Sequence, residues 1–233
     1  MNLPRIQYIT HPKEDFEDLH WLENLAEGGV QWVQLRIKEN HFKARYPNKD
    51  YASYFKETAL KVAEKCNSLG IILTVNDNYE FAKLNLIDGA HIGKEDEDHL
   101  VVREQLGNSK LLGCTANSWK DIKKYDLTKL DYLGVGPFNF TTTKDKDKLA
   151  PALGIRGYRI VVSQMKNKKW DTPVFAIGGI EEEDITMIMK TEVHGIAISG
   201  LIYNKYHTIK DIKRICKAVE DGKIETREFR TSV

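Results

Sequence analysis

The sequence has few cysteines and no long apolar run, and each shortage excludes a class of protein. Its three cysteines never form a C-x-x-C pair, so they carry no zinc signature. A small, odd number of cysteines is typical of a reducing compartment. No apolar stretch reaches the length that crosses a membrane, and residues 1–5 lack the start of a secretory signal. We therefore expect a cytoplasmic protein that does not bind a membrane.

An excess of charge of either sign is lacking as well. The chain has 35 lysines and arginines against 34 aspartates and glutamates, a formal net charge of +1. This near balance argues against a general polyanion binder, so we expect no nucleic-acid partner. An anionic small molecule would have to be held by a local cluster of cations. Hydrophobic residues make up 41% of the chain, which is enough for a large core and too much for a disordered protein.

The sequence does have a repeated alternation of short apolar segments with longer amphipathic ones. The expected strands are 5–10, 32–37, 71–77, 89–93, 111–116, 132–137, 173–178 and 195–199. Strands that alternate with helices form parallel sheets, and barrels of this kind have about 250 residues. We predict an α/β protein, a single (β/α)8 TIM barrel over residues 1–233, with a flexible tail from about residue 223. An open, doubly wound sheet is the alternative, because alternation alone does not show closure.

The connections between the expected strands carry two further signals. Glycines at 28–29, 70, 107 and 222 stand where helices are expected to end. Two connections, residues 39–50 and 138–152, are longer than ordinary ones, and both follow an expected strand. Loops that follow strands lie on the catalytic face of a barrel, and long loops often act as lids. We therefore expect both connections to border the site.

The second expected strand places two cations inside the barrel. Side chains alternate between the faces of a strand, so Gln34, Arg36 and Lys38 share the inner face. Cations in that position are costly unless an anion meets them. A carboxylate of the barrel could do so in a structural ion pair. We favour a ligand diphosphate, because the planar fork of arginine fits phosphate oxygens and lysine adds a mobile charge.

Two aspartates follow the next two expected strands. Asp77 ends the third strand and Asp96 lies just beyond the fourth, so the two carboxylates could approach each other across the barrel mouth. Magnesium is usually held by one or two carboxylates together with substrate phosphates and water. The alternatives are that these aspartates cap helices, or that residues 95–98 form a solvated acidic run. We expect His91 to be packed inside the barrel.

Segments near the end of the barrel are typical of phosphate binding. Residues 176–180, with Gly178-Gly179, lie at the end of the seventh expected strand, and Ile198-Ser199-Gly200 lies at the end of the eighth. Backbone amides at these places form the usual phosphate site of such barrels. Residues 141–144, which follow the sixth strand, add three threonine hydroxyls and one lysine ammonium. These signals indicate a phosphate ligand but no particular reaction.

Taken in order, these segments resemble the thiamine phosphate synthase family, which also includes thiazole tautomerases. The resemblance extends from about Ile6 to Ile202. It is carried by residues 34–38, 75–77, 88–96, 112–115, 134–137, 141–144, 176–180 and 196–199.

The resemblance implies a magnesium-dependent transferase that joins a pyrimidine diphosphate to a thiazole phosphate. In that family pyrophosphate leaves first, and the thiazole nitrogen captures the remaining cation. The pyrimidine diphosphate would be bound by Gln34, Arg36, Lys38, Asn76, Thr115 and Lys144. The thiazole phosphate would be bound by Thr141, Thr142, Thr143, Gly179, Ile198 and Ser199. Asp77 and Asp96 would hold Mg²⁺. Arg36, Lys38 and Lys144 would act in catalysis, because they can stabilise negative charge on the departing pyrophosphate.

This sequence departs from the family pattern at several places. Thr115 stands where the family usually has serine, and Asn117 where histidine is common. Lys94 replaces a common glutamine beside Asp96. Residues 138–140 replace a smaller apolar segment, and the 39–50 connection is longer than usual. None of these departures removes an expected magnesium ligand or phosphate-binding cation.

Three other functions remain alternatives at this point. A thiazole tautomerase moves a proton and expels no pyrophosphate, so the retained cations and aspartates would have no use there. A non-catalytic paralogue could bind a thiamine precursor with the same residues. An unrelated phosphate-binding barrel is a third reading, which the two strand-end aspartates count against. The sequence leaves the oligomeric state open, a homo-oligomer included.

Overall fold

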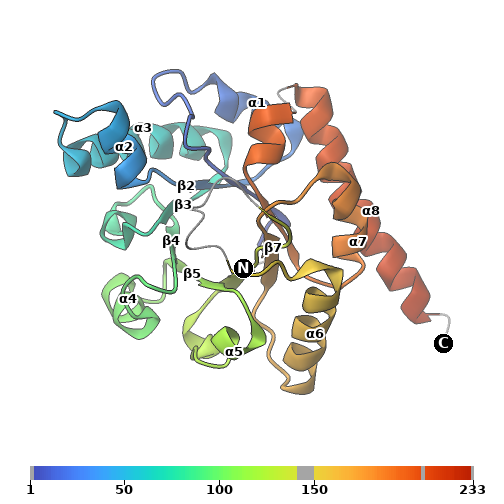
Figure 1. Ribbon diagram of the computed structural model, residues 1–233. Coiled ribbons are helices and arrows are strands. Elements are labelled where there is room, and N and C mark those ends of the chain that lie inside the picture. The colour runs from blue at the N-terminus through green and yellow to red at the C-terminus, as the bar shows by residue number, and fades with distance from the viewer. Residues whose placement is uncertain (1–2, 141–149, 206–207, 232–233) are drawn as a thin grey trace.

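Eight short parallel strands hydrogen-bond in chain order and close into a barrel in the computed structural model, which describes residues 3–140, 150–205 and 208–231, with side chains up to residue 222. Helices surround the strands as an outer ring (Figure 1). The strands are β1 (Ile6–Ile9), β2 (Trp32–Leu35), β3 (Ile72–Asn76), β4 (Gly89–Ile92), β5 (Leu111–Ala116), β6 (Tyr132–Val135), β7 (Val174–Ile177) and β8 (Gly195–Ile198). Each expected strand is present, with shorter ends in most cases.

Closure of the barrel depends on the first and last strands. Ile6 pairs with Ile196, and Tyr8 pairs with Ile198, in the same parallel sense as every other neighbouring pair. This pairing confirms the predicted barrel and excludes the open, doubly wound sheet.

The helical segments follow the strands, with two differences from expectation. The chain contains α1 (His20–Gly28), α2 (Glu39–Arg45), α3 (Tyr51–Leu69), η1 (Tyr79–Lys83), α4 (His99–Leu106), α5 (Trp119–Ile122), η2 (Leu127–Lys129), α6 (Gly154–Asn167), η4 (Glu182–Asp184), α7 (Ile185–Met189), η5 (Leu201–Lys205) and α8 (Ile209–Thr231). Only a short 3₁₀ helix, η1, follows β3. No helix in the described part of the chain is both long and apolar enough to cross a membrane.

The second difference is α2, which occupies most of the 39–50 connection that we expected to be a loop. Glu39 lies in its first turn and pairs with Lys43 one turn later at 2.6 Å. Such i,i+4 pairs stabilise a helix. With the negative charge nearer the N-terminus and the positive charge nearer the C-terminus, the pair also interacts favourably with the helix dipole. After this segment Asp50 caps α3 by accepting a hydrogen bond from the Ser53 amide at 2.8 Å.

The interior of the barrel is divided into an apolar half and a polar half. Trp32, Leu111 and Tyr132 each begin a strand, and together with Leu3 and Phe175 they form a separate buried cluster. The Trp32 ring meets the Tyr132 ring edge-on at 4.7 Å between centroids. This cluster fills the barrel at the N-terminal ends of the strands, so the polar side chains of the interior lie toward the C-terminal ends.

Not all of the glycines that we expected at the C-terminal ends of helices lie at such ends. Gly29 and Gly70 adopt the left-handed conformation as C-caps of α1 and α3, and Gly107 follows α4 with a positive φ. Gly222 was wrongly expected at a helix end. It lies within α8, which continues to Thr231 and so into the segment expected as a tail, whose flexibility stays a prediction. A Cβ at position 222 would lie 2.5 Å from Met189 Cβ of α7, so this glycine permits close helix packing.

We predict that Gly222→Ala destabilises the protein. Alanine is the better helix former, by up to about 1 kcal/mol, but its methyl group would force α8 away from α7. We expect the free energy of unfolding, measured by urea titration, to fall by about 1–3 kcal/mol. Lys213→Ala, at an exposed position of α8, is the control and should change it by about 0.5 kcal/mol or less. An unchanged or increased stability of Gly222→Ala would contradict the packing role.

Candidate active site

A cavity of ≈ 290 Å³ opens among the C-terminal ends of the strands. It is lined by residues from all strands of the barrel or the loops that follow them. Several residues predicted to bind substrate lie on its wall, namely Gln34, Arg36, Asn76, Thr115, Gly179, Ile198 and Ser199. Another cavity, of ≈ 370 Å³, lies near the N-terminal ends of β7 and β8 and contains none of the predicted site residues. The first cavity is therefore the candidate site.

A chain of hydrogen bonds crosses the buried interior below this cavity. Gln34 Nε2 donates to Gln7 Oε1 at 3.0 Å, and Gln7 Nε2 donates to the Tyr132 hydroxyl at 3.4 Å. The His91 ring continues the chain, with Nδ1 3.1 Å from that hydroxyl and Nε2 2.9 Å from Thr115 Oγ1. His91 is packed inside the barrel, as expected. The chain orients the side chains of Gln34 and Thr115, and two of its middle members, Gln7 and Tyr132, were not singled out in the sequence.

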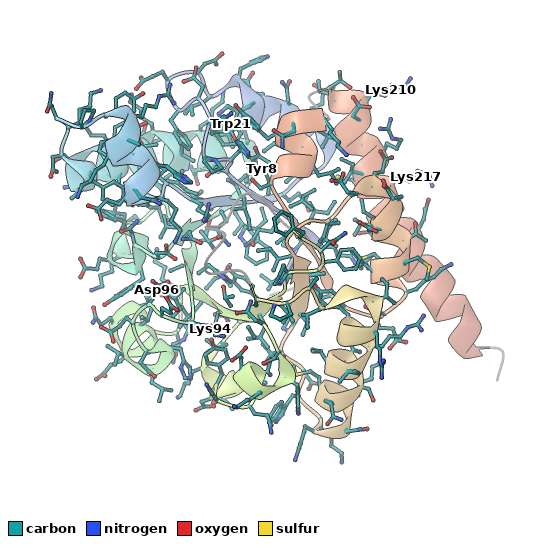
Figure 2. The ribbon with its side chains drawn as sticks, in the orientation of Figure 1. Tyr8, Trp21, Lys94, Asp96, Lys210 and Lys217 are labelled. Carbon is teal, nitrogen blue, oxygen red and sulfur yellow. The ribbon has the colours of Figure 1, made fainter. Side chains whose placement is uncertain are left out.

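The two aspartates lie together at the edge of the site. Asp96 is in the loop that joins β4 to α4 (Figure 2), where its carboxylate accepts a hydrogen bond from the Gly93 amide at 2.6 Å. Burial raises the pKa of Asp96, and the neighbouring carboxylate of Asp77 raises it further. Neither aspartate caps a helix with its side chain; Asp98 caps α4 instead. The effect of Asp77 on the pKa of Asp96 shows that the two carboxylates lie close enough to repel each other.

Lys38 offsets part of this charge. Its ammonium forms an ion pair with the Asp77 carboxylate. The structural ion pair that we considered as an alternative for the inner cations is thus present for Lys38. Both side chains are partly exposed, 37% for Lys38 and 25% for Asp77, so an incoming ligand can reach the pair.

The donor atoms at this place fit magnesium. Two carboxylates supply hard oxygen ligands, and a cation between them would relieve the repulsion that raises the pKa of Asp96. Within the described residues no group of three or more His, Cys, Asp or Glu could hold a metal. Two protein ligands, completed by phosphate oxygens and water, are how magnesium is usually bound.

The opposite wall of the cavity has the features of a phosphate site. Gly178 and Gly179 both have positive φ, and a Cβ at position 179 would lie 2.4 Å from the carbonyl oxygen of Phe140. The backbone can take this path only with glycine. Among the described residues, the Ser199 hydroxyl is buried without any hydrogen-bond partner. Such a group is costly in a folded protein, and a bound acceptor such as a phosphate oxygen would satisfy it.

The rim of the cavity contains contacts that the sequence did not indicate. The His11 ring, in the loop after β1, stacks on the Tyr203 ring of η5 at 4.0 Å with 8° between the planes. Lys205 of the same segment pairs with Glu181 at 2.6 Å. These contacts join the loops after β1, β7 and β8 around the cavity.

The departures from the family pattern are accommodated by polar contacts. Asn117 donates from its amide side chain to the carbonyl oxygen of Gly136, and so links the ends of β5 and β6. Lys94 pairs with Asp121 at 3.3 Å. Burial of Asp121 opposes its ionisation, but hydrogen bonds from Ser118, the Asn117 amide and Lys94 lower its pKa overall. The loops after β4 and β5 are thereby tied together.

Thr141, Thr142, Thr143 and Lys144 lie outside the residues that the structure describes. Their roles toward the two substrates stay predictions.

Comparison with known proteins identifies the family. A sequence model described as thiamine monophosphate synthase matches residues 6–202. The thiamine-phosphate synthase of Bacteroides fragilis is 40% identical over 210 residues, which are 90% of this chain and 97% of that protein. The same enzyme of Flavobacterium psychrophilum is 36% identical over 213 residues, 91% of this chain and 98% of that protein.

Solved structures agree on the fold. Thiamine phosphate pyrophosphorylase from Pyrococcus furiosus superposes with a TM-score of 0.75 at 23% identity, covering 94% of this chain and 96% of that one. The corresponding protein of Bacteroides thetaiotaomicron superposes with a TM-score of 0.65 at 18% identity, covering 93% and 98%. Since the sequence comparisons span most of both chains, the protein is a transferase of thiamine biosynthesis and belongs to the thiamine monophosphate synthase family.

Proposed function

We propose that this enzyme joins an aminopyrimidine methyl diphosphate to a thiazole phosphate and releases pyrophosphate and thiamine phosphate. The proposal is supported by one arrangement in particular. Arg36 and Asn76 line the cavity, and the Lys38–Asp77 ion pair follows them closely in the chain, with the Asp96 carboxylate near Asp77. Another part of the cavity wall carries the Ser199 hydroxyl, which has no hydrogen-bond partner among the described residues. The two ends of the site thus suit two different phosphate groups, one that leaves and one that stays.

The reaction that fits this arrangement breaks a carbon–oxygen bond before it forms a carbon–nitrogen bond. The electron pair of the broken bond leaves with pyrophosphate, and the pyrimidine methylene becomes a cation. The lone pair of the thiazole nitrogen then forms the new bond. No proton has to be removed by the protein, so the residues of the site serve to bind, orient and stabilise charge.

Charge on the departing pyrophosphate would be met by Arg36 and Lys38, two cations in the segment that follows β2. Arg36 lines the cavity, and the Lys38 ammonium can exchange its Asp77 partner for a phosphate oxygen. Asp77 and Asp96 would hold Mg²⁺, which supplies further neutralisation of the pyrophosphate when bound. Fixed charges of this kind stabilise the transition state because they are already oriented toward the place where charge develops.

Substrate positions follow from the polar groups of the wall. Gln34 and Asn76 would bind the pyrimidine and its diphosphate, while Thr115 is oriented by His91. Gly179, Ile198 and Ser199 would bind the thiazole phosphate. Residues 141–144 would complete both sites, with Lys144 on the pyrophosphate.

We also propose that the enzyme acts in the cytoplasm. All three cysteines are free, and burial raises the pKa of Cys66 and Cys114 to about 12. Unpaired thiols of this kind are typical of a reducing compartment.

The first prediction concerns the metal site. Asp77→Asn should lower turnover by on the order of 100-fold or more, because it removes one of the two carboxylates. Asparagine tolerates the positive φ of 63° at this position, so the backbone can keep its path. The measurement is pyrophosphate release with the pyrimidine diphosphate, the thiazole phosphate and Mg²⁺. Glu97→Gln, at an exposed position next to Asp96 with no proposed role in the site, is the control and should keep full activity.

The same assay separates the proposed activity from its alternatives. Release that requires both substrates and Mg²⁺ supports the synthase reaction. If wild-type enzyme binds the thiazole phosphate without releasing pyrophosphate, a tautomerase or a non-catalytic binding protein is the better description. Full activity of Asp77→Asn would overturn the metal-binding role alone.

The second prediction concerns the phosphate end of the site. Ser199→Ala should raise the KM for the thiazole phosphate by about 10- to 100-fold, since it deletes one hydrogen bond to a charged group. The free enzyme should lose no stability and should gain up to about 1 kcal/mol, because the deleted hydroxyl is buried and has no partner in the described part of the chain. Steady-state kinetics and thermal unfolding test the two halves of this prediction. Ser163→Ala, at an exposed position of α6, should alter neither quantity, and an unchanged KM for Ser199→Ala would remove this residue from the phosphate site.

A further inference from the structure

One tyrosine hydroxyl joins the C-terminal ends of β2 and β3. Tyr51, the first residue of α3, donates from its hydroxyl to the carbonyl oxygen of Ile37 at 2.7 Å. The same hydroxyl accepts a hydrogen bond from Asn78 Nδ2 at 2.9 Å. Ile37 immediately precedes Lys38, and Asn78 immediately follows Asp77. The tyrosine therefore holds the two neighbours of the Lys38–Asp77 ion pair.

The strands themselves do not provide this link. The register between β2 and β3 ends with Leu35 opposite Val75. Beyond that pair, the two segments that follow β2 and β3 continue toward the site without further pairing in this register. The Tyr51 hydroxyl bridges them where the ladder has ended.

Asp77 needs such support because of its backbone. Its φ is 63°, a left-handed conformation that residues with a side chain adopt uncommonly, although aspartate and asparagine tolerate it better than most. Conformations of this kind persist only where the surroundings determine them. The Asp77 amide donates to the His91 carbonyl oxygen at 2.8 Å, and the Tyr79 amide donates to the Asp77 carbonyl oxygen at 2.7 Å. The hydrogen bond from the Asn78 side chain to the Tyr51 hydroxyl adds a third contact that restrains the backbone next to Asp77.

The Tyr51 ring is itself held in place by the additional helix α2. Its centroid lies 5.5 Å from that of Phe42, a buried residue of α2, and 5.9 Å from that of Phe55. Burial raises the pKa of Tyr51 to about 12, so the hydroxyl keeps its proton at neutral pH and can donate to Ile37. The connection between β2 and α3 thus supplies a helix against which Tyr51, at the start of α3, packs.

We propose that Tyr51 is a positioning residue of the metal and pyrophosphate site, where it sets the distance between Lys38 and Asp77 through Ile37 and Asn78. This role requires no contact of Tyr51 with the substrate or the metal, and Tyr51 is not among the residues that line the cavity. The proposal rests on the proposed function, because it assigns Asp77 to Mg²⁺ and Lys38 to the pyrophosphate.

The test replaces the hydroxyl and keeps the ring. Tyr51→Phe should weaken the binding of preformed magnesium pyrophosphate, titrated calorimetrically into the metal-free enzyme, by about 10-fold, the lower end of the effect of losing an outer partner of a metal ligand. In turnover, kcat should fall by a similar factor while the KM for the thiazole phosphate stays unchanged, since that phosphate lies at the other end of the cavity. A purely structural role would not produce this division between the two substrates.

Tyr54→Phe is the matched control. Tyr54 belongs to the same helix and the same aromatic group, with its ring centroid 4.7 Å from that of Phe42. It should leave magnesium pyrophosphate binding and kcat unchanged. Equal losses in the two phenylalanine variants would overturn the proposal, because they would show a general loss of packing.

A double-mutant cycle tests the route of the effect. Asn78→Ala should weaken magnesium pyrophosphate binding. The double variant Tyr51→Phe/Asn78→Ala should bind magnesium pyrophosphate as well as the single variant with the lower affinity. Additive losses would overturn the proposal, since the two residues would then act separately. If Tyr51→Phe binds as tightly as the wild type, the role of Tyr51 is overturned while the proposed function stands. If the wild type itself neither binds magnesium pyrophosphate nor turns over, both are overturned.

Discussion

The hydrogen bonds between β1 and β8 join parts of the chain that lie far apart in sequence, with Ile6 beside Ile196 and Tyr8 beside Ile198. This pairing turns a row of parallel strands into a ring, and a ring has only one mouth at the C-terminal ends of its strands. Candidate groups from distant parts of the chain therefore face a common space, including Gln34 from β2, Thr115 from β5 and Ser199 after β8. An open sheet would have left the first and the last of these at opposite edges.

Within the barrel, apolar packing and polar function are separated along the axis. Trp32, Tyr132 and Phe175 meet edge-on at the N-terminal end and exclude water there. Tyr132 also belongs to the polar half, because its hydroxyl takes part in the chain of hydrogen bonds from Gln34 to Thr115. A residue that is part of the packed core thus also orients the wall of the site, which couples the stability of the barrel to the geometry of binding.

Charge at the mouth is balanced locally. Asp77 and Asp96 repel each other, and Lys38 compensates one of them. This arrangement is consistent with the proposed ligands, a metal ion and a pyrophosphate. The metal ion would reduce the repulsion between the carboxylates, and the pyrophosphate would form an ion pair with Lys38. Lys94 does not add to this set of cations in the free enzyme, because it pairs with Asp121 at 3.3 Å. The departure at this position therefore has a structural explanation.

The sequence by itself determined what depends on local periodicity. Strand positions followed from short apolar segments, and the inward direction of Gln34 and Arg36 followed from the two-residue repeat of a strand. Gly222 was misread because a glycine that ends a helix and one that admits a neighbouring helix look alike in one dimension. Only the tertiary structure decided which residues meet across long separations. The closure of the barrel, the Gln7–Tyr132 contact and the Tyr51 bridge to Asn78 join residues whose proximity depends on the whole ring, and no local pattern encodes it.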